Sequence, residues 1–70
     1  MITASQCRAA RGLLDWTQKD LAEKSRIGIV TIRQFEGGKT EPMHATMVVL
    51  KRAFEAAGVE FLAQDGVRRK

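Results

Sequence analysis

Apolar residues recur at helical spacing near the start of the chain. Thr3 followed by Gln6 is a capping-box pattern, in which the two side chains satisfy backbone N–H groups at the start of a helix. Cys7, Ala10 and Leu14 then recur three and four residues apart, which is typical of one buried helix face. The pattern predicts a first helix that ends near Leu14.

A second helix is predicted directly after the first. Thr17 is a residue type that caps helices, and Asp20 suits the positive end of the first turn. Leu21 then begins the inward face of a helix over residues 18–25. Residues 26–28 form a tight connection to the next element.

The segment GIVTIRQFEGG, residues 28–38, predicts a third helix that ends at paired glycines. At about 100° per residue, Glu36 lies close to Ile32, which we take as the centre of the buried face. Val30 and Gln34 fall on nearly the opposite side. The outward face therefore begins with an aliphatic residue, where a surface helix normally carries a polar one.

The helical period returns at about His44 and runs to Gly58, which predicts the longest helix of the chain. Residues 59–70 change to the alternating period of a strand. Within them, Asp65 and Gly66 form a favoured two-residue hairpin turn. Because an isolated hairpin is marginal in water, this one is expected to lie on the domain or to pair with a second copy.

The pattern as a whole predicts an all-α fold, a compact repressor-like domain of four to five helices with a short C-terminal strand or hairpin. Residues 1–58 are assigned to a helix-turn-helix domain, whose motif covers about residues 17–36, because two short helices joined by a tight turn define that motif. Residues 59–70 are assigned to a strand-like tail, which is a candidate dimerisation element.

The motif and its surroundings resemble a known family. From Arg11 through about Phe54 the sequence is similar to the phage-repressor-like Cro/XRE class of DNA-binding domains, through the stretches TQKDLAEKS and TIRQFEGGKTEP. The matching positions are Gln18, Leu21, Ala22, Ile27, Thr31, Ile32, Phe35, Glu36, Gly38 and Pro42.

The resemblance implies that the third helix lies in the major groove of double-stranded DNA, so we expect a transcription regulator, either repressor or activator. A homodimer is expected on separate grounds, because a chain of this size forms only a small core and the strand-like tail can pair with a second copy. The base-contacting positions of the family correspond to Ile29, Val30 and Gln34, with Arg33 one step round the helix as a further candidate. Apolar side chains can read the thymine methyl group, and a glutamine can pair with adenine. The plainer alternatives are a core residue at Ile29 and an ordinary exposed aliphatic at Val30.

Contacts to DNA phosphates are assigned to a second set of residues. Gln18 matches the glutamine that meets a phosphate in the family, although a first-turn glutamine satisfied by water is the alternative. Arg26, Thr31 and Lys39 are further candidates, and the alternative for the two basic residues is a solvated surface charge. Each phosphate that is neutralised steepens the salt dependence of binding by about one unit of log–log slope.

Arg11 and Glu36 are expected to form a structural ion pair. The resemblance implies it, and a charge on the inward side of the third helix also needs a partner; the alternative is that both face solvent.

Two departures from the family pattern concern the turn. Arg26 stands where relatives usually have glycine, so it is expected to adopt a left-handed conformation at a cost of about 1 kcal/mol. Gly28 stands where they usually have a serine or threonine cap.

Composition limits the size of the core, the charge of a partner and the cellular compartment. The chain has 70 residues, enough for one small core, and a net charge of +4, which suits an anionic partner. Cys7 is its only cysteine, so no intrachain disulfide forms, and it is expected to pack as a small hydrophobe. With no apolar run near the roughly 18 residues of a membrane span, we expect a cytoplasmic protein and no membrane partner.

Catalysis finds little support in the sequence. There is no glycine-rich phosphate loop, no zinc-ligand spacing and no nucleophile–base pair, so no enzyme activity, metal or cofactor is expected. His44, the only histidine, is expected to be exposed in a first helical turn.

A protein-interaction module, such as an antitoxin-type partner with secondary DNA binding, remains the alternative function, because exposed aliphatic residues also suit a protein partner.

Overall fold

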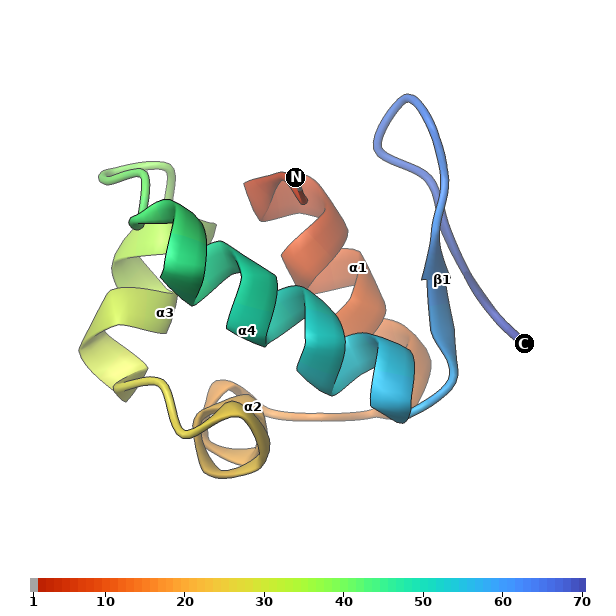
Figure 1. The fold of residues 1–70 in the computed structure, drawn as a ribbon, viewed down its shortest axis with the longest axis horizontal. Helices are drawn as coiled ribbons and strands as arrows, with labels where there is room; N and C mark the ends of the chain where they lie inside the picture. Colours follow the sequence, from red (N-terminus) through yellow and green to blue (C-terminus); the bar gives the residue numbers. More distant parts are fainter. Residues whose placement is uncertain (1) are drawn as a thin grey trace.

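Four helices precede a short antiparallel hairpin in the computed structural model, which describes residues 2–70 (Figure 1). The prediction of an all-α domain with a C-terminal hairpin is confirmed. Within the described residues, no helix combines the length and the apolar character that crossing a membrane requires. The elements are α1 (Ala4–Leu14), α2 (Gln18–Ser25), α3 (Ile29–Glu36), α4 (His44–Ala56), β1 (Val59–Phe61) and β2 (Val67–Arg69).

Side-chain caps fix the starts of α1 and α2, as the sequence predicts. The Thr3 hydroxyl accepts the Gln6 N–H at 3.1 Å, and the Gln6 side chain accepts the Thr3 N–H at 3.0 Å. Thr17 and Asp20 repeat this arrangement at the start of α2. Each cap satisfies backbone donors that have no partner inside the helix, and so determines where the helix begins.

The turn between α2 and α3 depends on a left-handed residue. Arg26 has a φ of 61°, as expected for the residue that stands in the place of a glycine. The Ser25 hydroxyl supports this turn by donating to the Leu21 carbonyl at 2.7 Å and accepting the Ile27 N–H at 3.2 Å. Gly28 then begins α3 without a side-chain cap. The turn therefore keeps its shape at a small cost in strain at Arg26.

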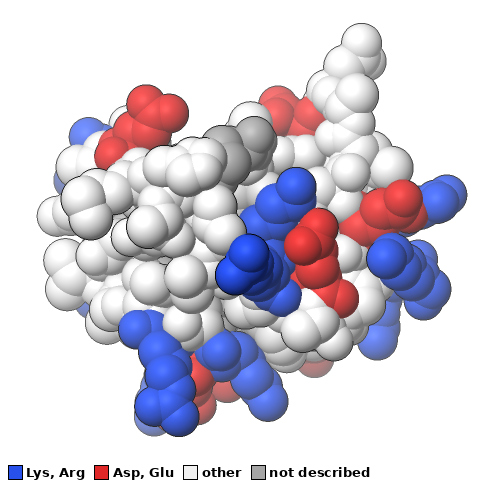
Figure 2. Space-filling view, viewed as in Figure 1, with Lys and Arg blue, Asp and Glu red and all other residues white. Residues whose placement is uncertain are grey.

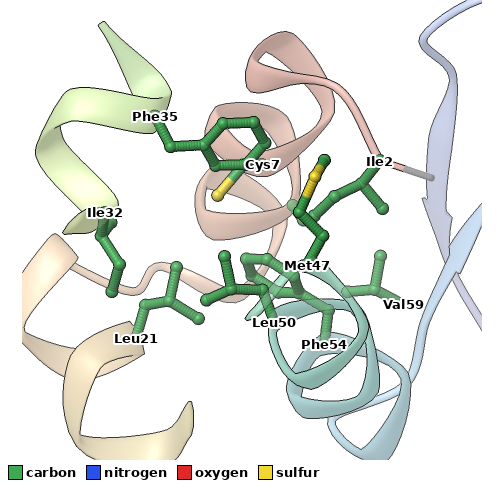
Figure 3. Close-up of a cluster of buried hydrophobic side chains, with 10 residues drawn as sticks. Ile2, Cys7, Leu21, Ile32, Phe35, Met47, Leu50, Phe54 and Val59 are labelled. Carbon is green, nitrogen blue, oxygen red and sulfur yellow. The ribbon is translucent and has the colours of Figure 1, made fainter. Parts of the chain in front are cut away.

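The hydrophobic core takes one face from each helix and closes against the hairpin. Figure 3 shows its side chains converging between the helices, with Val59 of β1 on the side of the hairpin. The Trp16 ring stacks on Phe54 with ring centroids 5.8 Å apart, and Phe61 meets the edge of Phe54 at 5.9 Å. The buried hydrophobic residues are Ile2, Cys7, Ala10, Leu21, Ile32, Phe35, Met47, Leu50, Phe54 and Val59.

The hairpin does not close through the predicted two-residue turn. The last strand pair is Phe61 with Val67, so the loop consists of residues 62–66. Its left-handed residues are Gln64, with a φ of 59°, and Asp65, with a φ of 64°. The prediction from the Asp65-Gly66 dipeptide was wrong because contacts with α1, rather than local turn preference, determine the shape of this loop.

Those contacts come from the cap of α1. Gln6 Nε2 donates to the carbonyls of Leu62 and Gly66, both at 3.0 Å. The Thr3 hydroxyl donates to Asp65 Oδ1 at 2.7 Å. The same two residues that begin α1 therefore also hold the hairpin loop, and the hairpin lies on its own domain. In Figure 1 it stands at the opposite end of the long axis from α3.

We expect Gln6→Met to lower the free energy of unfolding by about 1–3 kcal/mol, because the loop carbonyls lose their hydrogen-bond donor. Urea denaturation followed by circular dichroism measures this change. The matched control is Gln64→Met, at an exposed glutamine of the same hairpin. Equal stability of the two variants would show that Gln6 does not hold the hairpin.

Candidate nucleic-acid interface

The outward face of α3 carries three of the four predicted base contacts. Val30 is 59% exposed, and Arg33 and Gln34, three and four residues further on, are also exposed. Residues at this spacing lie on the same side of a helix. Ile29 and Thr31 flank this face and are half-buried. The structure therefore brings Val30, Arg33 and Gln34 together on one surface, with Ile29 at its edge.

Basic residues stand at both ends of α3. Arg26 precedes the helix and Lys39 follows it, and both are exposed. The Lys39 N–H donates to the Gln34 carbonyl at 2.9 Å, which fixes the chain where it leaves the helix. Figure 2 shows basic side chains gathered over α2 and the turn after it, whereas the surface over α3 and the start of α4 is mostly uncharged.

Behind this face, the Glu36 carboxylate accepts hydrogen bonds from three side chains. Arg11 Nη2, at 2.6 Å, and Gln18 Nε2, at 3.0 Å, donate to Oε1. Arg11 Nε, at 2.8 Å, and Cys7 Sγ, at 3.0 Å, donate to Oε2. A carboxylate has about four lone-pair sites, so these donors satisfy it fully. The ion pair expected between Arg11 and Glu36 is present in the structure, and it joins α1 to α3.

The electrostatics of this cluster follow from its burial. The Glu36 side chain is 3% exposed and that of Arg11 is 19% exposed. Burial alone would raise the pKa of the Glu36 carboxyl, but hydrogen bonds from Arg11, Cys7 and Gln18, together with the charge of Arg11, hold it below its ordinary value. The hydrogen bond to Glu36 also raises the pKa of the Arg11 guanidinium, against the effect of burial. Glu36 is therefore ionised at neutral pH.

The sequence did not predict two of the hydrogen-bond partners of Glu36. Cys7 is buried as expected, yet it also donates to Glu36, so its role is not only that of a small hydrophobe. Gln18 opens α2 and is half-buried, with its amide on Glu36 rather than satisfied by water alone. No local signal in the sequence connects residues that lie 29 and 18 positions from Glu36.

No three His, Cys, Asp or Glu side chains between residues 2 and 70 lie close enough together to hold a metal ion. His44 is exposed at the start of α4, as predicted.

Two helices joined by a tight turn, with the second presenting an exposed face flanked by basic residues, define a helix-turn-helix DNA-binding domain. The comparison with protein families agrees. A helix-turn-helix family model of the Cro/C1 (XRE) type matches residues 8–59, and the chain belongs to this family. Its members are DNA-binding regulators rather than typical enzymes, which supports a role in transcription regulation. A search of curated proteins found no match.

We expect Glu36→Gln to lower the free energy of unfolding at pH 7 by about 3–5 kcal/mol, because Arg11 is left without its buried counter-charge. The wild-type protein should also lose stability in acid. Since the pKa of Glu36 is lowered by folding, its contribution is present above about pH 4.3, the ordinary value, and disappears as the pH falls through the folded value.

Urea denaturation between pH 2.5 and 7 measures both effects. Glu60→Gln is the matched control, because Glu60 pairs with Arg68 at 2.6 Å on the exposed hairpin, where an ion pair contributes about 1 kcal/mol or less. If Glu36→Gln and the wild type lost stability in acid to the same extent, the ionised Glu36 would not be the stabilising group.

We expect Cys7 to react with a thiol reagent only when the protein unfolds. The thiol is fully buried. Burial first, and then the hydrogen bond to Glu36 and its negative charge, raises the pKa of Cys7 far above the ordinary value. Labelling rates in increasing urea should therefore follow the unfolded fraction. Fast labelling of the native protein would contradict this placement of Cys7.

Proposed function

We propose that the chain is a sequence-specific transcription regulator that places α3 in the major groove of double-stranded DNA. The observation that carries this proposal is the division of α3 into two faces. Ile32, Phe35 and Glu36 are buried against the domain, while Val30 and Gln34 point outward and have no part in the core. An α-helix fits the major groove, and side chains on its outer face then meet the edges of the bases.

The outward residues match the chemistry of that groove. The Val30 side chain offers an apolar contact for the thymine C5-methyl group, and Gln34 can form two hydrogen bonds with adenine. Arg33 reaches either a guanine or a phosphate. Ile29 is half-buried, so we assign only its exposed part to base contact. A site read by this face should contain thymine opposite Val30.

Phosphate contacts would come from residues around α3. We assign these contacts to Gln18 at the start of α2, to Arg26 and Lys39 at the two ends of α3, and to Thr31. Arg26 and Lys39 are exposed, and the chain carries a net charge of +4, both of which favour binding to a polyanion.

The bound form is proposed to be a homodimer on a twofold-related site, in which each copy reads one half-site about one helical turn from the other. Residues 59–70 are the candidate dimerisation element. The hairpin stands at the far end of the domain from α3, so a second copy can contact it without covering the reading face (Figure 1). Occupying such a site would regulate transcription by blocking RNA polymerase or by contacting it.

The test is selection from a random duplex library, followed by binding of the selected duplex to variants. We expect an enriched inverted repeat, and we expect Gln34→Ala to lose about 1–3 kcal/mol of discrimination at one base pair. Val30→Ala should relax the preference for thymine. The matched control is Val49→Ala, at an exposed residue of α4.

A different result would favour the alternative function. Selection without enrichment, and only weak binding that is lost steeply with salt, would contradict base reading by α3. The exposed Val30 would then suit a protein partner of the antitoxin type.

Sedimentation equilibrium of the free protein and of the complex tests the dimer, because a monomer on each half-site at all concentrations would exclude it.

A further inference from the structure

A hydrogen bond to Glu36 fixes the orientation of the Gln18 side-chain amide. Its Nε2 donates to Glu36 Oε1 at 3.0 Å. A carboxylate only accepts hydrogen bonds, so the nitrogen of the amide, rather than its oxygen, must face Glu36. The nitrogen carries two hydrogens, and the one bonded to Glu36 leaves the second pointing away from the carboxylate. Among residues 2–70, no acceptor bonds to this second N–H.

The backbone around Gln18 adds further donors. At the N-terminus of α2, the Thr17 and Asp20 N–H groups are taken by the capping box. The N–H groups of Gln18 and Lys19 have no acceptor among the described residues. Gln18 therefore presents its free side-chain N–H beside unpaired backbone donors, at the end of a helix whose dipole favours an anion.

We propose that Glu36 is a positioning residue for DNA binding, which holds the Gln18 amide so that its second N–H donates to a DNA phosphate. The inference rests on the proposed DNA-binding function and adds a residue that never touches DNA. One amide nitrogen would bridge two anions, the buried carboxylate and the phosphate. Without Glu36 the amide would rotate freely, and ordering it on the phosphate would cost side-chain entropy.

Arg11 reduces the repulsion between the Glu36 carboxylate and the phosphate. A carboxylate next to a phosphate would normally repel it. Here Arg11 Nη2 and Nε lie 2.6 and 2.8 Å from the two Glu36 oxygens, so the charge of Glu36 is balanced inside the protein. The phosphate would approach the amide on its outer side, while the ion pair remains within the domain.

The first test compares Gln18→Met with the wild type on the selected duplex. Methionine keeps the length of the side chain but has no N–H, so we expect affinity to fall about tenfold, as for the loss of one hydrogen bond to a charged group. A duplex with a neutral methylphosphonate at the facing phosphate should weaken the wild type similarly and Gln18→Met no further. Val49→Met, at an exposed residue of α4, is the control and should bind as the wild type does.

The second test separates positioning from folding. Glu36→Met, which has no oxygen to accept from Gln18, is made with and without Gln18→Met, and affinities are expressed per folded molecule. We expect Glu36→Met to weaken binding about as much as Gln18→Met does, and to have no further effect when Gln18→Met is already present. Its effect on stability should be the same in both cases, because Arg11 loses its partner either way. Equal losses of affinity with and without Gln18→Met would overturn the inference.

A third measurement needs neither the variant nor DNA. In the wild type, the NMR signals of the Gln18 side-chain NH₂ should shift as Glu36 is protonated in acid, while those of Gln34 and Gln64 should not. An unmoved Gln18 signal would overturn positioning by Glu36. A duplex bound equally well by Gln18→Met would overturn only the phosphate contact of this inference. Failure of the wild type to bind any duplex would overturn the proposed function and the bridge together.

Discussion

The buried carboxylate of Glu36 is the constraint on which the arrangement of the first three helices depends. An ionised group that is almost wholly removed from water is tolerated only if it is paired and fully hydrogen-bonded. Arg11 and Cys7 of α1 and Gln18 of α2 meet this requirement together. Arg8 of α1 also donates to the Glu36 backbone carbonyl. A single side chain of α3 therefore fixes where α1 and α2 lie against it.

This constraint also determines what the molecule presents to its surroundings. Glu36 and the core residues Ile32 and Phe35 fix the rotation of α3 about its own axis. Val30 and Gln34 must then face outward. The turn before α3 departs from the family pattern at Arg26, yet Arg26 adopts the left-handed conformation that glycine would otherwise supply. The motif can therefore keep its shape with an arginine in the turn, and this arginine adds an exposed positive charge beside α3.

The sequence predicts this fold well where the signals are local. Both capping boxes connect residues three positions apart, and the starts of α1 and α2 follow from them. The Arg11–Glu36 pair was accessible because an inward charge demands a partner and the family resemblance names one. The bonds from Cys7 and Gln18 to Glu36 were not, because no periodicity indicates which helix faces meet in space. The prediction of the hairpin turn failed for the same reason, because it used only the local Asp-Gly preference. Thr3 and Gln6, from the other end of the chain, form the hydrogen bonds that determine the shape of this loop.

One surface, made by the outward face of α3 and the start of α2, is proposed to meet DNA. Titration of ¹⁵N-labelled protein with the selected duplex, followed by NMR, tests this claim directly. The expected result is that the largest shifts occur at Gln18, Val30, Arg33 and Gln34, while the outer face of α4 changes little. Shifts confined to α4 or to the basic residues of β2, with α3 unchanged, would contradict the account.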